Sequence, residues 1–237
     1  MFMKQESYKF HHTARNFESS QEVIKVLMPF FKGLTSILDL GGGVGAWSSA
    51  FHEAGYPEPT LIDHPGVDRD RLLIKDKRNF LAFDLEKQLP PVNKYDLAVC
   101  IEVLEHFSAN RALQIHDYLC NCSNLILFSA AIPGQGGVGH QNCRRHYYWH
   151  EQFAEKGFAF FDGFKPLLIS NDKIHYWIRQ NLFIYYKPDQ AHRLNGIPNI
   201  TTTEFEIIYR DIISRKMGIR EYLKMAPGVF LKRQKWG

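Results

Sequence analysis

The stretch ILDLGGGVGAW, from Ile37 to Trp47, decides the fold of this 237-residue chain. A short apolar run passes directly into four glycines, and a segment with helical apolar spacing follows at 46–55. Glycine permits positive φ and lets a backbone approach a ligand closely. A glycine turn between a buried strand and a helix is typical of cofactor sites in α/β proteins. We therefore predict a strand at 35–40, a helix at 46–55, and a ligand on the turn between them.

The same alternation continues along the chain and predicts a doubly wound α/β fold around a mostly parallel sheet. Strands are expected at 35–40, 59–63, 79–85, 95–103, 124–132, 164–170 and 179–187, and helices at 19–33, 46–55, 108–119 and 147–157. Ser19 should cap the first helix and Pro29 should end it early. No helix is expected between the last two strands, so they should form an antiparallel pair at one edge.

Composition and charge suggest one main domain with two extensions. We expect an N-terminal helical cap at 1–34, the α/β domain at 35–189 and a basic extension at 190–237, with a helix near 202–218. The net charge is +4, and the last 23 residues hold seven Lys and Arg against one Glu. Such a tail could contact an anionic surface weakly, although a solvated helical face is the more ordinary interpretation.

Other classes of protein are disfavoured. The sequence contains no apolar run long enough for a membrane span and no secretory signal pattern, so a cytoplasmic location is expected. The four cysteines lack metal-ligand spacing and are expected to be free thiols. No metal triad is visible, although a site assembled from loops would leave no such pattern. No specific nucleic-acid partner is predicted, and the sequence does not indicate an oligomeric state.

Acidic residues stand at the ends of four predicted strands. They are Asp39, Asp63, Asp84 and Glu102. The carboxyl ends of parallel strands meet at one edge of a sheet, so these side chains should converge on one crevice. Asp39 would repel a diphosphate but suits a cofactor with an ammonium and a sulfonium. Asp63 could accept both hydroxyls of an unphosphorylated ribose. The pattern Gly41-x-Gly43-x-x-Ala46 also fits a dinucleotide fingerprint, so an NAD-dependent dehydrogenase is the rival.

Five segments together resemble class I S-adenosylmethionine-dependent methyltransferases. They are ILDLGGGVG, LIDHPGVDRDRLLI, FLAFDL, YDLAVCIEVLEHF and FSAAIPGQGGVGHQN. The resemblance covers about residues 35–187 and implies a Rossmann-like, seven-stranded sheet with an antiparallel last strand. It further implies that Gly41, Gly43 and Gly45 wrap the methionine and ribose portions of the cofactor. Asp63 would then hold the ribose, Asp84 and Leu85 would face the adenine, and Glu102 would lie near the methionine end.

A second glycine run, IPGQGGVGHQNCRRHYYW at 132–149, follows the fifth predicted strand. No helix follows its glycines at once, so no aligned amides await a phosphate. An adaptable loop over the site is expected instead. The resembled subfamily carries SAAIPGQGG-x-GH-x-N here, a later W-[YI]-RQN that matches 177–181, and an association with sugar or glycan modification. His140 is the candidate base, with His106 second, since a histidine titrates near neutral pH. The alternative for His140 is ordering the loop.

The remaining residues of this run point to the acceptor. Asn142 would orient it, and Tyr148 and Trp149 could stack on a sugar face or pack in the core. Arg144 and Arg145 replace part of an Asn-Glu-Gln-Trp pattern of the resembled family. They favour an anionic acceptor unless they are simply solvated. The sequence thus predicts an S-adenosylmethionine-dependent O-methyltransferase for a sugar or glycan hydroxyl. The alternatives are O- or N-methylation of another small metabolite, or a cofactor-binding interaction module without turnover.

Overall fold

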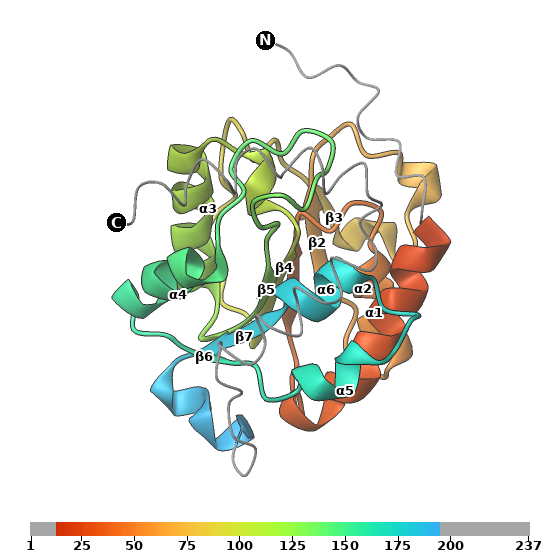
Figure 1. Cartoon of the computed structure of the whole chain (residues 1–237). Helices are drawn as coiled ribbons and strands as arrows, with labels where there is room; N and C mark the ends of the chain where they lie inside the picture. Colours follow the sequence, from red (N-terminus) through yellow and green to blue (C-terminus); the bar gives the residue numbers. More distant parts are fainter. Residues whose placement is uncertain (1–12, 195–237) are drawn as a thin grey trace, which may run out of the picture. The chain divides into compact units, whose positions relative to one another are not determined.

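The computed structural model describes residues 13–194, and these build a single seven-stranded sheet (Figure 1). The strand order is β3-β2-β1-β4-β5-β7-β6. The strands are β1 (Ile37–Leu40), β2 (Thr60–Asp63), β3 (Phe80–Ala82), β4 (Leu97–Ile101), β5 (Leu125–Ser129), β6 (Ala159–Phe161) and β7 (Phe183–Tyr186). Strands β1 to β5 pair in parallel, whereas β7 is antiparallel to both β5 and β6. The predicted doubly wound sheet with an antiparallel last strand is confirmed.

Helices cover both faces of the sheet. They are α1 (Thr13–Leu27), α2 (Ala46–Glu53), α3 (Ala109–Cys122), α4 (His146–Glu155), α5 (Lys165–Ile169) and α6 (Tyr176–Asn181). Short 3-10 turns occur at η2 (Met28–Phe30), η3 (Arg69–Arg71), η4 (Lys77–Asn79), η5 (Leu104–His106) and η6 (Pro188–Leu194). Figure 1 places α3 and α4 on one face and α1, α2, α5 and α6 on the other. None of the helices within 13–194 is long and apolar enough to cross a membrane.

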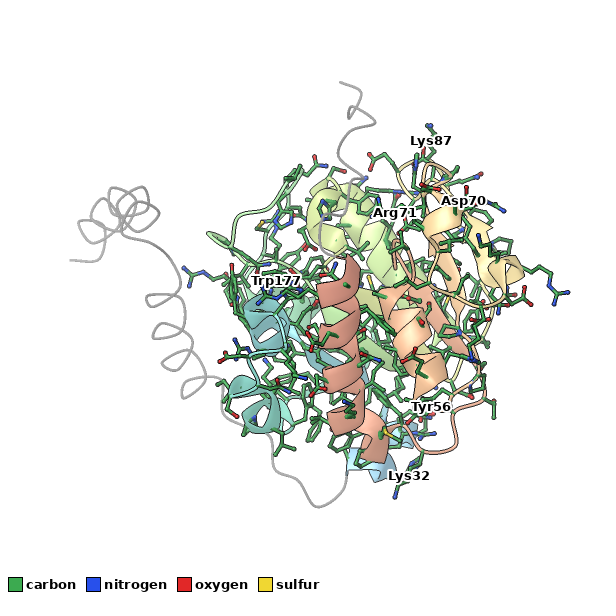
Figure 2. The ribbon with its side chains drawn as sticks, turned by 90° about the vertical axis from the view of Figure 1, so that its right-hand side faces the viewer. Lys32, Tyr56, Asp70, Arg71, Lys87 and Trp177 are labelled. Atoms are coloured by element: carbon green, nitrogen blue, oxygen red, sulfur yellow. The ribbon has the colours of Figure 1, made fainter. Side chains whose placement is uncertain are left out.

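The two faces of each central strand belong to two different cores. In β4, Leu97 and Val99 pack with α1 and α2, whereas Ala98 and Cys100 pack with α3. A strand buried on both faces is a continuous apolar run, which is how this strand reads in the sequence. Figure 2 shows α1 beside α2 across one layer, with Trp177 of α6 next to α1.

The segment 164–170, expected as a strand, is instead a helix. It forms α5, and the sixth strand is the preceding β6. Pro166 lies in the first turn of α5, where its missing N–H costs nothing, whereas a strand would lose a ladder hydrogen bond. A second short helix, α6, includes residues 179–181 of the expected last strand, so β7 begins only at Phe183. The predicted antiparallel edge pair is confirmed. The predictions that 164–170 is its first strand and that no helix lies between the two strands were wrong.

The first helix also begins earlier than its apparent cap. α1 starts at Thr13, and the Ser19 hydroxyl lies inside it, accepting a hydrogen bond from the His175 amide at 3.1 Å. The predicted stop is confirmed, since α1 ends at Leu27 and Pro29 lies in η2. The four cysteines are free thiols, as expected. The expected helix near 202–218 and the basic tail lie outside the described residues.

Phe153→Ala is expected to lower the free energy of unfolding by about 3–5 kcal/mol, because it opens a cavity among aromatic rings. Phe153 is fully buried, and its ring stacks on Tyr185 with 3.7 Å between centroids. Urea unfolding measures the change. Leu167→Ala on α5 is the control, because that side chain is 63% exposed and should cost less than about 0.5 kcal/mol. Equal losses in both variants would contradict the packing described for this face.

Candidate active site

The first glycine turn is fixed to the ends of two neighbouring strands. Gly41 has φ +74°, and its amide donates to the Ile62 carbonyl at 2.7 Å. A Cβ on Gly41 would lie 2.6 Å from a methyl of Val103, so no larger residue fits without displacement. The Gly43 amide donates to the Asp63 carboxylate at 2.6 Å, and Gly45 then begins α2 from a left-handed conformation. The turn is therefore shaped by its packing before any ligand arrives.

Asp39 lies beneath this turn and not in the crevice. Its carboxylate accepts hydrogen bonds from the amide (3.1 Å) and hydroxyl (2.7 Å) of Ser48, and its exposed fraction is only 2%. A Cβ on Gly42 would overlap the same carboxylate. Burial raises the pKa of Asp39 to about 6. Asp39 therefore holds the turn against α2, and a contact between its carboxylate and a cofactor stays a prediction.

Asp63 and Asp84 follow adjacent strands and lie on either side of His64. Asp63 accepts from the His64 amide at 2.5 Å as well as from Gly43. Asp84 is held by Lys87 at 2.8 Å, and the His64 Nε2 lies 3.7 Å from it. The side chain of Leu85 is 5% exposed. Both carboxylates remain partly exposed at the carboxyl edge of the sheet, where a ribose would present its hydroxyls.

Glu102 joins three segments in what we name the Glu102 clamp, made of Glu102, Gln135 and Asn181. Its carboxylate accepts from the Gln135 side-chain amide at 2.6 Å and from the Asn181 side-chain amide at 3.1 Å. Asn181 also donates to the Gln135 carbonyl oxygen at 2.7 Å. Glu102 has φ +55°, and among residues 13–194 it is the one non-glycine with positive φ. Side-chain hydrogen bonds therefore join the end of β4, the second glycine run and the end of α6.

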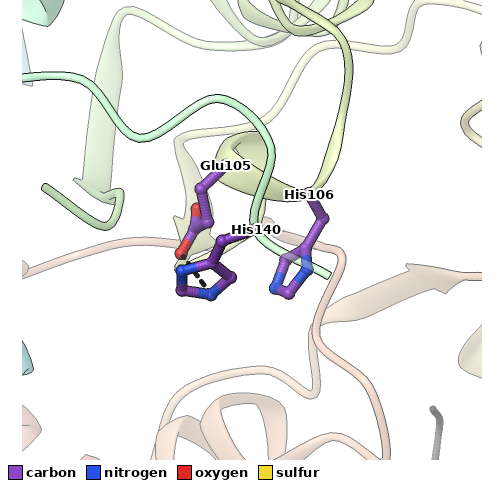
Figure 3. A group of neighbouring side chains, drawn as sticks. All are labelled: Glu105, His106 and His140. Carbon is purple, nitrogen blue, oxygen red and sulfur yellow. Dashed lines mark ion pairs between the residues drawn. The ribbon is translucent and has the colours of Figure 1, made fainter. Parts of the chain in front are cut away.

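Two histidines and a buried carboxylate meet next to the clamp (Figure 3). Glu105 and His106 belong to η5, and His140 comes from the second glycine run. The His140 Nε2 lies 3.9 Å from a Glu105 oxygen, and the two imidazoles lie edge to face with 4.8 Å between centroids. Glu105 is fully buried, with the Glu102 carboxyl group and the Ala131 backbone as its polar neighbours. We name these three residues the Glu-His-His cluster.

The protonation of this cluster follows from its burial. Burial, reinforced by the neighbouring Glu102 carboxylate, raises the pKa of Glu105 well above its usual range. Burial lowers the pKa of His106 to about 4 and also lowers the pKa of His140. Both imidazoles are consequently neutral at pH 7, each with a lone pair able to take a proton or a cation.

The second glycine run is shaped around His140. A Cβ on Gly137, whose φ is +133°, would overlap the imidazole of His140. The amides of Gln141 and Asn142 both donate to the Glu105 carbonyl, at 2.9 and 3.1 Å. The run thus wraps His140 and is anchored on η5 through the two residues that follow this histidine.

The comparisons with known proteins decide the family. The methyltransferase domain family matches residues 10–182. The chain belongs to this methyltransferase-domain family. Among curated proteins, none matches the chain.

Three solved structures of similar fold accompany that match. Magnesium protoporphyrin IX methyltransferase from Synechocystis, with bound S-adenosylmethionine, is 17% identical, with 73% of this chain and 80% of that one covered and a TM-score of 0.53. An O-methyltransferase family protein from Burkholderia thailandensis is 14% identical, with 78% and 63% covered and a TM-score of 0.52. The methyltransferase domain of bacterial CtHen1-C is 18% identical, with 73% and 98% covered and a TM-score of 0.52. At these identities the likeness shows the fold alone.

The expected acceptor residues of this methyltransferase domain separate into buried and accessible ones. Trp149 is 2% exposed and packs edge to face on Phe128, so it belongs to the core and offers no face to a sugar. Asn142 is 4% exposed, and its side-chain oxygen accepts from Arg144 at 2.7 Å. The Arg144 guanidinium lies 5.1 Å from the Tyr148 ring centre. Arg145, just before α4, is exposed.

Three residues of the candidate site were missed by sequence reasoning: Glu105, Gln135 and Asn181. Glu105 adjoins His106 in the LEHF segment, but an acid there reads as solvated until the turn is known to be buried. Gln135 and Asn181 lie far apart in the chain, and only the RQN signature at 179–181 gave a signal for the second.

Asp39→Asn is expected to flatten the pH dependence of stability between about pH 4 and 6. The pKa of Asp39 is raised to about 6 in the native protein, against roughly 3.9 in an unfolded chain. The native state therefore binds more protons in this window, and stability falls as the pH rises through it. The loss is on the order of 3 kcal/mol for a pKa difference of about 2. Urea unfolding of both proteins at several pH values tests this, and parallel curves would contradict it.

Proposed function

We propose that this methyltransferase transfers a methyl group from S-adenosylmethionine to a hydroxyl oxygen of a sugar or glycan. The observation that carries the proposal is the division of one sheet edge. The glycine turn, Asp63 and Asp84 lie at the ends of β1 to β3. Glu105 and His106 of the Glu-His-His cluster follow β4, and its His140 follows β5. The first group suits an unphosphorylated nucleoside, and the second suits activation of a poor nucleophile.

The residues of the turn fit S-adenosylmethionine better than a dinucleotide. No Lys or Arg occurs from Asp39 to Phe51, and the Gly43 amide is already taken by Asp63. A diphosphate would find few free donors there and two carboxylates nearby. Each Asp63 oxygen retains a lone pair for a ribose hydroxyl. S-adenosylmethionine would supply an electrophilic methyl group on a cationic sulfonium, and buried acids such as Glu102 favour a cation.

The protein's own contribution to the reaction is positioning and proton removal. An in-line displacement needs the acceptor oxygen behind the methyl carbon, and holding it there supplies much of the rate. A hydroxyl must also lose its proton. We assign that step to the Glu-His-His cluster, with His140 as the base and His106 as the second choice, because both imidazoles are neutral at pH 7.

An anionic acceptor agrees with the accessible residues beside the cluster. Arg145 is exposed and Arg144 is partly exposed above Tyr148, so together they could bind a carboxylate or phosphate next to an aromatic face. Nucleotide sugars, lipid-phosphate-linked glycans and uronic acids share that chemistry. The competing functions are O- or N-methylation of another small metabolite and cofactor binding without turnover.

Asp63→Asn should weaken S-adenosylmethionine binding by about tenfold or more, because an amide replaces a charged acceptor for the ribose and for Gly43. Isothermal titration calorimetry measures the dissociation constant. Asp70→Asn is the matched control, since that side chain is 99% exposed near the same end of the molecule (Figure 2). NAD should not bind either protein. Tighter binding of NAD than of S-adenosylmethionine would support the dehydrogenase instead.

Replacing Arg144 and Arg145 with alanine should raise KM for an anionic sugar by about tenfold or more, because the acceptor loses a charge-assisted hydrogen bond. The affinity for S-adenosylmethionine should not change. A panel of charged and neutral sugars with labelled cofactor measures both, with Arg78→Ala as control because Arg78 is 91% exposed and away from the cluster. An unchanged KM would contradict the proposal that the acceptor is anionic. No release of S-adenosylhomocysteine with any acceptor would favour the interaction module.

A further inference from the structure

We infer that Glu105, His106 and His140 form a binding site for a divalent metal cation, at which the acceptor hydroxyl is activated. The existence of the site stands on its own geometry. Its role in activation rests on the proposed transfer to a hydroxyl.

The first observation is the convergence of three ligand types on one point. One ligand atom from each residue lies within 4.8 Å of the others, and Figure 3 shows the carboxylate and both imidazoles turned toward a common space. Metal bonds to these groups are about 2.0–2.2 Å long, so modest side-chain rotations bring all three into contact with one ion. Three protein ligands leave at least one position open for another oxygen.

The second observation is the state of the Glu105 carboxylate. It is fully buried beside the Glu102 carboxyl group and the Ala131 backbone. Two carboxyl groups buried side by side need a shared proton or a nearby cation, because two adjacent buried negative charges repel each other. The closest cationic candidate is His140, and 3.9 Å is too long for a hydrogen bond between them. A cation between the two groups would satisfy both.

The surroundings orient His140 for this role. Its Nδ1 faces the Cys143 sulfur at 3.7 Å, which leaves Nε2 directed at Glu105. Gly137 lies against the ring, and the Glu105 carbonyl anchors the two residues after His140. Outer contacts of this kind fix the tautomer and orientation of a metal-ligating histidine.

The donor set indicates the class of metal. Two imidazole nitrogens and one carboxylate suit first-row divalent cations such as Mn²⁺, Co²⁺ and Zn²⁺, whereas Ca²⁺ prefers oxygen donors throughout. A hydroxyl bound to such a cation has a lowered pKa. Its proton leaves to water, the O–CH3 bond forms as the S–CH3 bond breaks, and the electron pair stays on sulfur to give a neutral thioether. His140 is then a ligand of the cation, and no side-chain base is required.

Co²⁺ binding to the full chain, freed of metal by chelation and without a polyhistidine tag, tests the site directly. Calorimetry should give one equivalent, and the visible absorption of Co²⁺ should change on binding. Glu105→Gln and His140→Ala should each weaken binding by about tenfold to a hundredfold or more. His192→Ala is the control for adventitious histidine binding, because His192 is exposed and lies on η6. Thermal unfolding of each apoprotein establishes that the variants are folded.

Two outcomes separate this inference from the proposed function. Equal Co²⁺ binding by the wild type and Glu105→Gln, or no binding by either, would overturn the metal site, and methyl transfer by chelated protein would then leave His140 as the base. Binding that is lost in the variants, together with no methylation of any acceptor, would establish the metal site and refute the transferase proposal. Loss of methyl transfer on chelation, restored by Mn²⁺ or Co²⁺, is the result expected if both hold.

Discussion

The carboxylate of Glu102 is the interaction on which the rest of the site depends. Glu102 follows the central strand β4 and adopts a positive φ, which costs about 1–3 kcal/mol. Its carboxylate accepts hydrogen bonds from Gln135 and Asn181. Because β4 also pairs with β1, the position of the second glycine run is fixed relative to the first. The clamp thus links the loop that carries His140 to the strand that precedes Glu105 through the Gln135–Glu102 hydrogen bond.

The sheet could be predicted from the sequence because its signals are local. Strands buried on both faces are short apolar runs, and the glycine turn marks where the first one ends. The error at 164–170 has the same origin, since a short apolar run does not distinguish a strand from a buried helix turn. Pro166 is the local signal against a strand, because it fits the first turn of a helix. The prediction that Ser19 caps the first helix was wrong for a similar reason, because the capping pattern lies inside a helix that already begins at Thr13.

The sequence placed the candidate residues at one edge of the sheet, but it did not indicate what each of them contacts. Four acids at strand ends predict a site at this edge, yet burial separates Asp39, which supports the turn, from Asp63, which remains partly exposed. Trp149 and Tyr148 are neighbours in sequence, but Trp149 is buried whereas Tyr148 is only partly buried against the same core. The clamp and the Glu-His-His cluster join segments distant in the chain, and such contacts follow from tertiary packing that no single-sequence pattern encodes.

The buried acids at this edge of the sheet lower the free energy of unfolding, which favours a functional role for them. Burial raises the pKa of Asp39, Asp63, Glu102 and Glu105, so each ionised carboxylate there is less stable than in water. A protein selected for stability alone would replace such groups with apolar residues of similar volume. A cationic sulfonium near Glu102 and a divalent cation at Glu105 would reverse the sign of the local electrostatic energy. This arrangement suits positively charged ligands. In the free protein it lowers the free energy of unfolding, as is common for functional sites.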